Sequence, residues 1–320
     1  FMKVYCALTA VLLVGGLLEY ANIFPTWPAI GTAALDMYWI RHVPGYIVKL
    51  TSGFYRSPDM LGWHAALLVM FSLLMALYSK GVVSRGLWTA LAAWGVTILL
   101  ISGRNKMIFM PPIFIAGLGL SYFYKANFSK VGAASLAVVL SGALFWGINQ
   151  QMAIDREYLD YVGVGVESAG SRVESHGFSA VTTTLRQSGF FGEGLGAAST
   201  GARYGGTLMG ARVWQESGPS KIMVELGVTG FIAAALLGLT LLRLLWRCLD
   251  QMPRAAPQGV LFIGFLGILA ANAASFTVSH QAFGDPFLVT LAGFFIGVTL
   301  SAPRWAFGYQ LPRQAMNARH

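Results

Sequence analysis

Residues 60–78, MLGWHAALLVMFSLLMALY, contain no lysine, arginine or acidic residue and decide the fold class of the chain. A helix needs about 20 mostly apolar residues to cross a bilayer, and this stretch is one of eight that meet or approach that length. The eight predicted spans are residues 4–20, 60–78, 86–101, 107–124, 131–148, 222–246, 260–278 and 287–302. We therefore predict an all-α, polytopic integral membrane protein.

The composition agrees with a membrane protein, because 56% of the 320 residues are hydrophobic and only 11% are charged. So few charged residues could not cover the surface of a soluble domain of this size.

The predicted organisation has three parts. Residues 1–148 hold spans one to five with an outer segment at 22–59, residues 149–221 form one large outer loop, and residues 222–320 hold the last three spans and a tail. The first span is short and lacks a signal-peptide cleavage site, so we expect the chain to be a piece of a longer protein.

The net charge of +9 is explained by topology rather than by nucleic acid. With the loops numbered alternately from an inside N-terminus, the inside set carries eleven basic residues and a single acid, Asp250, whereas the outside set carries the other twelve acids. Lysine and arginine near span ends mark the cytoplasmic side. We expect both termini in the cytoplasm, the large loop outside, the lipid bilayer as surroundings and no nucleic-acid partner.

Metal and cofactor signals are weak in this sequence. Both cysteines, Cys6 and Cys248, fall towards the predicted inner side, so the outer loop has no disulfide. No phosphate-binding P-loop and no zinc-binding HExxH motif occurs. We expect neither a metal nor a cofactor, with a metal held by scattered outer carboxylates as the remaining alternative.

Basic residues next to the predicted spans are candidates for binding an anion. Arg104 and Lys106 lie in a very short outer hairpin between two spans, against the usual charge bias, and we expect an anionic ligand to neutralise them. Arg56 lies in a turn before the span at 60–78 and is either a phosphate ligand or a membrane-edge anchor.

The large loop carries a predicted helix from about residue 171 to 188. Ser171 and Glu174 fit a capping box at its start. Arg172, His176 and Arg186 share one face of this helix, together with a serine and a threonine. The face is either a diphosphate-binding stripe or the polar side of an ordinary amphipathic helix.

The end of the loop offers further candidates. Glycines at 192, 194 and 196 predict either an anion-binding nest of backbone N–H groups or a tight turn that re-enters the membrane. Arg212 and Lys221 are candidate substrate ligands, and Lys221 is expected to pair with Glu225 four residues later. Pro219 suits the first turn of the next span, and Glu216 lies just before it.

Several short motifs together resemble the bacterial O-antigen ligase and polymerase superfamily. They are Gly-Phe-Tyr-Arg-Ser-Pro-Asp at 53–59, Ser-Gly-Arg at 102–104, Arg172, Gly-Glu-Gly-Leu-Gly at 192–196 and Glu-Leu-Gly-Val-Thr-Gly at 225–230. The similarity extends over residues 17–230. It implies a glycosyltransferase of the inner membrane, with its site facing the periplasm, that uses an undecaprenyl-diphosphate-linked saccharide donor and a glycan acceptor. Other polysaccharide-assembly proteins would be its partners.

By the same resemblance, Arg104 and Arg172 bind the diphosphate. Ligases of the superfamily commonly place a histidine nine residues before the Glu-Leu-Gly motif, whereas this chain has Glu216 there. This departure favours a polymerase over a ligase. A carboxylate or an imidazole would accept the proton of the acceptor hydroxyl, and Glu216 and His176 are the two candidates for that base.

Two other functional classes remain as alternatives. The first is a transporter or flippase for a lipid-linked or anionic solute, but such proteins usually show internal repeats and polar residues at mid-membrane. The second is a membrane scaffold whose loop binds a partner, which leaves the cations at Arg104 and Lys106 unexplained. The enzyme is the interpretation that we prefer.

Overall fold

The computed structural model describes residues 1–23, 39–43, 46–124, 184–185, 188–198, 217–252 and 257–308. The chain divides into two compact units, Phe1–Ala169 and Gly170–His320, which are described separately. Six helices in the described residues are long and apolar enough to cross a membrane: Met2–Tyr20, Pro58–Tyr78, Val82–Ile101, Gly218–Gln251, Gly259–Val278 and Pro286–Arg304. The prediction of a mostly helical protein with several membrane spans is confirmed to that extent.

Two of the eight predicted spans are not among these six. The span predicted at 131–148 lies outside the described residues. The span predicted at 107–124 is divided into a short helix α5 (Asn105–Ile108) and helix α6 (Met110–Tyr124). Pro111 and Pro112 lie in the first turn of α6, where the missing backbone N–H groups of proline cost least.

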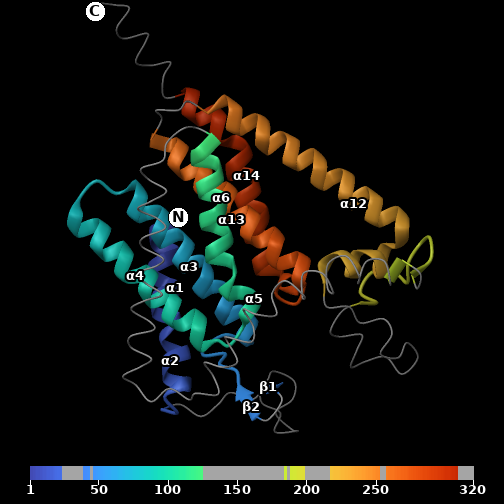
Figure 1. The fold of residues 1–320 in the computed structure, drawn as a ribbon, viewed down its shortest axis with the longest axis horizontal. Helices are drawn as coiled ribbons and strands as arrows, with labels where there is room; N and C mark the ends of the chain where they lie inside the picture. Colours follow the sequence, from blue (N-terminus) through green and yellow to red (C-terminus); the bar gives the residue numbers. More distant parts are fainter. Residues whose placement is uncertain are drawn as a thin grey trace, which may run out of the picture. The chain divides into compact units, whose positions relative to one another are not determined.

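Helix α3 (Pro58–Tyr78) is the centre of the first unit. It contacts α1 (Met2–Leu12), α4 (Val82–Ile101), α5 and α6, so that it runs among its neighbours (Figure 1). Almost all of its side chains are buried, including Trp63 and Phe71. A helix that is apolar on every side is expected in such a central position.

The first span consists of α1 and α2 (Val14–Tyr20), which meet at Leu13. Glu19, near the end of α2, is buried although it carries a carboxylate. Its Oε2 accepts hydrogen bonds from the backbone N–H groups of Ser52, at 2.9 Å, and Gly53, at 2.6 Å. These bonds fasten the segment that leads into α3 to the end of the first span.

The outer segment at 22–59 contains a small antiparallel sheet. Strands β1 (Ile40–Val43) and β2 (Tyr46–Lys49) pair with Ile40 opposite Lys49 and Val43 opposite Tyr46. The all-α prediction included no strand in this segment, so the hairpin is an addition to a chain that is otherwise mostly helical in its described residues. Tyrosine, isoleucine and valine favour strands, but the sequence signal is only four residues long on each side.

Among its described residues, the second unit has three long helices that contact one another: α12 (Gly218–Gln251), α13 (Pro257–Val278) and α14 (Pro286–Gly308), with a 3₁₀ turn η3 (Ala282–Gly284) before α14. Helix α12 begins as predicted, with Pro219 in its first turn and Ser217 as its N-cap. It is interrupted at Gly227, whose φ of 66° and ψ of −165° are not helical. Figure 1 shows the sharp bend close to the start of α12.

Candidate anion-binding site

The site is built on the tight turn that joins α4 to α5. Ser102 ends α4, and its Oγ donates a hydrogen bond of 2.6 Å to the carbonyl oxygen of Leu99. Gly103 then takes a left-handed conformation, with φ of 67°, that other residues rarely adopt. The N–H of Arg104 donates back to the Ser102 Oγ at 3.4 Å. The short hairpin predicted between two apolar helices is therefore present, and it presents three consecutive polar residues, 104–106.

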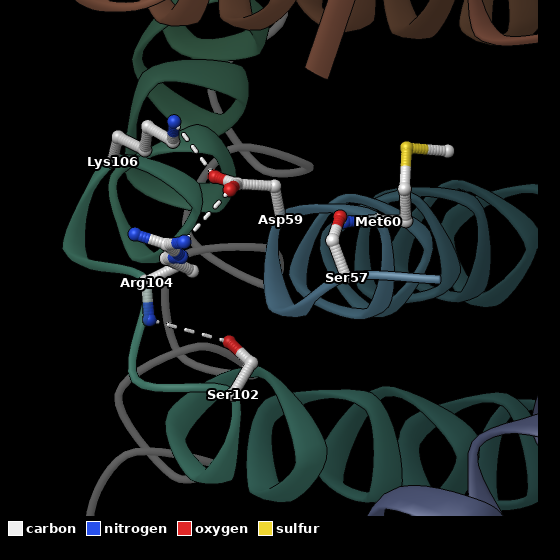
Figure 2. A network of polar contacts seen from close by, with 6 residues as sticks. All are labelled: Ser57, Asp59, Met60, Ser102, Arg104 and Lys106. Atoms are coloured by element: carbon white, nitrogen blue, oxygen red, sulfur yellow. Dashed lines mark hydrogen bonds and ion pairs between the residues drawn. The ribbon is translucent and has the colours of Figure 1, made fainter. Parts of the chain in front are cut away.

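Asp59 lies between the two cations of this turn, as Figure 2 shows. One carboxylate oxygen is 2.9 Å from an Nη of Arg104, and the other is 2.7 Å from the Nζ of Lys106. The three side chains are largely buried, with exposed fractions of 8% for Asp59, 14% for Arg104 and 11% for Lys106. The sequence predicts that an anionic ligand neutralises the two cations, and the structure adds Asp59, whose carboxylate pairs with both of them. Asp59, Arg104 and Lys106 together carry a formal charge of +1.

Helix α3 explains why Asp59 points to this place. Ser57 is the N-cap and accepts a hydrogen bond from the N–H of Met60, while Pro58 begins the first turn. A carboxylate in the first turn is favoured by the partial positive charge at a helix N-terminus. The motif Ser-Pro-Asp therefore places a fixed anion at the start of α3, where Arg104 and Lys106 meet it.

The site also contains buried polar atoms without a hydrogen-bond partner. Among the described residues, neither side-chain atom of Asn105 that can form hydrogen bonds has a partner, although the residue is only 7% exposed. The Nε of Arg104 likewise has none within the described part of the chain. Buried polar groups in proteins are normally hydrogen-bonded, so exceptions need an explanation. A bound anion would supply acceptors for both the guanidinium and the amide.

The other predicted site residues fall into two groups. Arg56 is exposed in the turn that precedes α3, and Lys221 lies in the second unit, where its Nζ pairs with Glu225 at 2.5 Å as predicted. The rest lie outside the described residues: Arg172, His176, Arg186, Arg212 and Glu216. Among the described residues of the first unit, the structure therefore brings two of the candidates, Arg104 and Lys106, together.

An anion nest is one of the two interpretations of the glycine-rich stretch at 192–196, and the N–H groups at its centre are already engaged. The N–H of Glu193 donates to the carbonyl oxygen of Val224 at 2.7 Å, and the N–H of Gly194 donates to that of Glu225 at 3.1 Å. Both carbonyls precede the break at Gly227, where the helical pattern of hydrogen bonds is interrupted. The two N–H groups are thus engaged in tertiary structure rather than turned towards a ligand.

Residue-by-residue reasoning missed three polar side chains of the first unit. Asp59 follows directly after Ser-Pro, which is a recognisable helix start in the sequence. Asn105 gives no sequence signal beyond its place between Arg104 and Lys106. His64 is buried in α3, accepts or donates a hydrogen bond of 2.7 Å with the hydroxyl of Tyr5, and stacks on Tyr55 with ring centroids 4.8 Å apart.

The donors of this turn are of the kind that suits an anionic ligand. A guanidinium, an ammonium and an amide N–H₂ offer several donors at a buried edge, where charge-assisted hydrogen bonds are stronger than in water. Comparisons of the chain with protein-family models, with curated proteins and with solved structures find no match. The functional assignment therefore depends on these residues and on the motifs of the sequence.

Proposed function

We propose that this chain is a membrane glycosyltransferase that moves a saccharide from an undecaprenyl-diphosphate donor to a sugar hydroxyl during assembly of a surface polysaccharide. A polymerase is favoured over a ligase because Glu216 stands where ligases commonly have histidine. The observation that carries the proposal is the turn at 104–106, with its two cations and with buried donors on Arg104 Nε and Asn105 that have no hydrogen-bond partner among the described residues. The turn follows α4, a helix long and apolar enough to cross a membrane, and the phosphates of a lipid-linked donor would lie at the end of such a helix.

The chemistry requires no external energy source. The bond between the anomeric carbon and the diphosphate oxygen breaks, and its electron pair stays on the diphosphate. The acceptor hydroxyl oxygen forms the new glycosidic bond and loses its proton to a base. Negative charge therefore grows on the leaving diphosphate, and preorganised donors aimed at such charge are an effective form of catalysis. Arg104, Asn105 and Lys106 would supply these donors.

The remaining roles are proposed from the sequence. Glu216 and His176 are the candidates for the base, and Arg172, Arg186 and Arg212 are further candidates for holding the donor. The charge distribution supports an inner-membrane location with the site on the periplasmic side, because cytoplasmic loops are the ones enriched in lysine and arginine.

A transporter or flippase is the second candidate, and two observations favour it. Glu19 and His64 are ionisable groups buried within predicted membrane spans, and such residues often mark a substrate or ion pathway. Both, however, have partners inside the protein. Glu19 accepts hydrogen bonds from backbone N–H groups, and His64 forms a hydrogen bond with the hydroxyl of Tyr5. The enzyme therefore remains the better explanation of the polar cluster at Asp59 and Arg104.

The test is a transfer assay with the purified full-length protein in liposomes. A synthetic undecaprenyl-diphosphate oligosaccharide is supplied, and both the elongated glycan and the released lipid diphosphate are measured. Arg104→Ala and Arg172→Ala are expected to abolish transfer, whereas Arg85→Ala, at the exposed opposite end of α4, should leave it unchanged. Movement of the donor across the bilayer without a new glycosidic bond would overturn the enzyme in favour of the transporter.

A further inference from the structure

The loop at 189–196, called the aromatic loop below, is held firmly against the break in α12. Besides the hydrogen bonds from Glu193 and Gly194, the carbonyl oxygen of Phe190 accepts from the backbone N–H of Thr229 at 3.5 Å and from its Oγ1 at 3.3 Å. A Cβ added at Gly192 would lie 2.8 Å from the carbonyl oxygen of Glu225. The aromatic loop and the helix therefore meet backbone to backbone.

The aromatic loop nevertheless exposes three large apolar side chains. The exposed fractions are 61% for Phe190, 80% for Phe191 and 82% for Leu195, and the two phenylalanine rings pack edge to face with centroids 5.0 Å apart. Burial of such a side chain is favoured over leaving it in water. A loop that is held in place and exposes three large apolar side chains indicates that these side chains lie in an apolar environment.

The same helix shows what that environment is. Beyond Gly227, α12 exposes a series of large apolar side chains: Ile232, Leu236, Leu237, Leu239, Leu242 and Leu244. A helix of membrane-spanning length with exposed apolar residues faces lipid. Ile232 is five residues after Gly227, or about 7 Å along a helix with a rise of 1.5 Å per residue. The aromatic loop is thus bonded to the helix within a short distance of the lipid-facing surface.

We propose that the aromatic loop inserts Phe190, Phe191 and Leu195 into the boundary between lipid headgroups and acyl chains. Apolar side chains on an amphipathic element settle at this depth in a bilayer. The ion pair of Lys221 and Glu225 lies before the break in α12, and the exposed apolar side chains lie after it. The aromatic loop is attached at the point where the exposed side chains of the helix change from polar to apolar. The bilayer surface is the partner that this loop fits, and the inference does not depend on the proposed enzymatic function.

The test places an environment-sensitive fluorophore on the aromatic loop of the full-length protein. In a background with Cys6→Ala and Cys248→Ala, the variants Phe191→Cys and Leu195→Cys are labelled with the fluorophore NBD and reconstituted in phosphatidylethanolamine–phosphatidylglycerol vesicles. Glu193→Cys is the matched control, because Glu193 is a polar, exposed residue of the same loop. Size-exclusion chromatography checks that each variant is folded, and two reporter positions keep the test valid if one of them fails.

The expected result is a blue-shifted emission at positions 191 and 195 and quenching by lipids that carry a nitroxide near the top of the acyl chain. Aqueous iodide should quench these two positions several-fold less than position 193. Equal quenching by iodide at all three positions, without quenching by the nitroxide lipid, would overturn the proposal and leave the aromatic loop in water or against another protein.

Discussion

The carboxylate of Asp59 lies 2.9 Å from the guanidinium of Arg104, which fixes the start of α3 to the turn between α4 and α5. The two residues are far apart in the sequence, so their contact exists only because α3 packs against α4 and α5. It holds the arginine in place, and Lys106 shares the same carboxylate, so one negative charge faces two positive ones. The contact is therefore both a structural link and a competitor for any bound anion.

Asp59→Asn should loosen this link and strengthen anion binding. Because the three side chains are largely but not fully buried, we expect the free energy of unfolding to fall by about 1–3 kcal/mol, between the values for surface and buried ion pairs. Affinity for inorganic diphosphate should rise as the competing carboxylate is lost. Unfolding in mixed micelles and a binding titration measure the two effects. Additive effects of Asp59→Asn and Arg104→Ala in a double-mutant cycle would contradict the pairing.

Asn105→Leu separates ligand binding from structural support. The Asn105 amide makes no hydrogen bond to the described part of the protein, and replacing an unpaired buried polar group by an apolar one of similar shape is neutral or stabilising. We expect an unchanged or higher unfolding temperature together with weaker binding of diphosphate. Lower stability with unchanged binding would show that the amide serves the fold and not a ligand.

Gly227→Ala should disrupt the attachment of the aromatic loop. The φ of 66° and ψ of −165° at Gly227 suit glycine almost alone, and a new Cβ would meet the backbone of Phe190 and Gly192. We expect a loss of about 3 kcal/mol or more in the free energy of unfolding, measured in mixed micelles. Gly238→Ala is the matched control, because it has open space around it in the same helix and should be neutral or stabilising by up to about 1 kcal/mol. Equal changes in the free energy of unfolding for Gly227→Ala and Gly238→Ala would contradict a special backbone conformation at Gly227.

Glu19→Ala should destabilise the first unit through the backbone of Ser52 and Gly53. Their two buried N–H groups would lose their acceptor, at a cost of about 1–3 kcal/mol for each unsatisfied group. Glu19→Gln keeps one acceptor oxygen and should be intermediate. The midpoint of thermal unfolding in detergent measures this series, with exposed Glu193→Ala expected to stay close to the unaltered protein. A Gln variant as unstable as the Ala variant would indicate that the charge, and not the hydrogen bonding, is what matters.

The sequence pattern predicts the parts of this protein that depend on local physics. Apolar stretches of membrane length give the spans, Pro219 marks the start of α12, and the spacing of Lys221 and Glu225 gives their ion pair. A tight hairpin at Arg104 is predicted because only five residues separate the apolar stretches at 86–101 and 107–124. Each of these depends on neighbours along the chain, which is why composition and spacing suffice.

The missed features depend on contacts between distant segments. Asp59 reads locally as a helix start, and only the packing of α3 against α4 and α5 brings it to Arg104. The break at Gly227 falls within an apolar stretch that otherwise favours a continuous helix, and its hydrogen bonds are satisfied by the aromatic loop. The hairpin of β1 and β2 is too short to leave a clear alternating pattern.

The most direct test of the central claim is the binding of undecaprenyl diphosphate to the full-length protein in lipid nanodiscs. The dissociation constant is measured for the unaltered protein, for Arg104→Ala and for the control Arg85→Ala. If the turn at 104–106 binds the diphosphate, Arg104→Ala should weaken binding by about tenfold or more, equivalent to about 1.4 kcal/mol, while Arg85→Ala binds as the unaltered protein does. Equal affinity in all three proteins would contradict the claim that Arg104 binds the lipid-linked diphosphate.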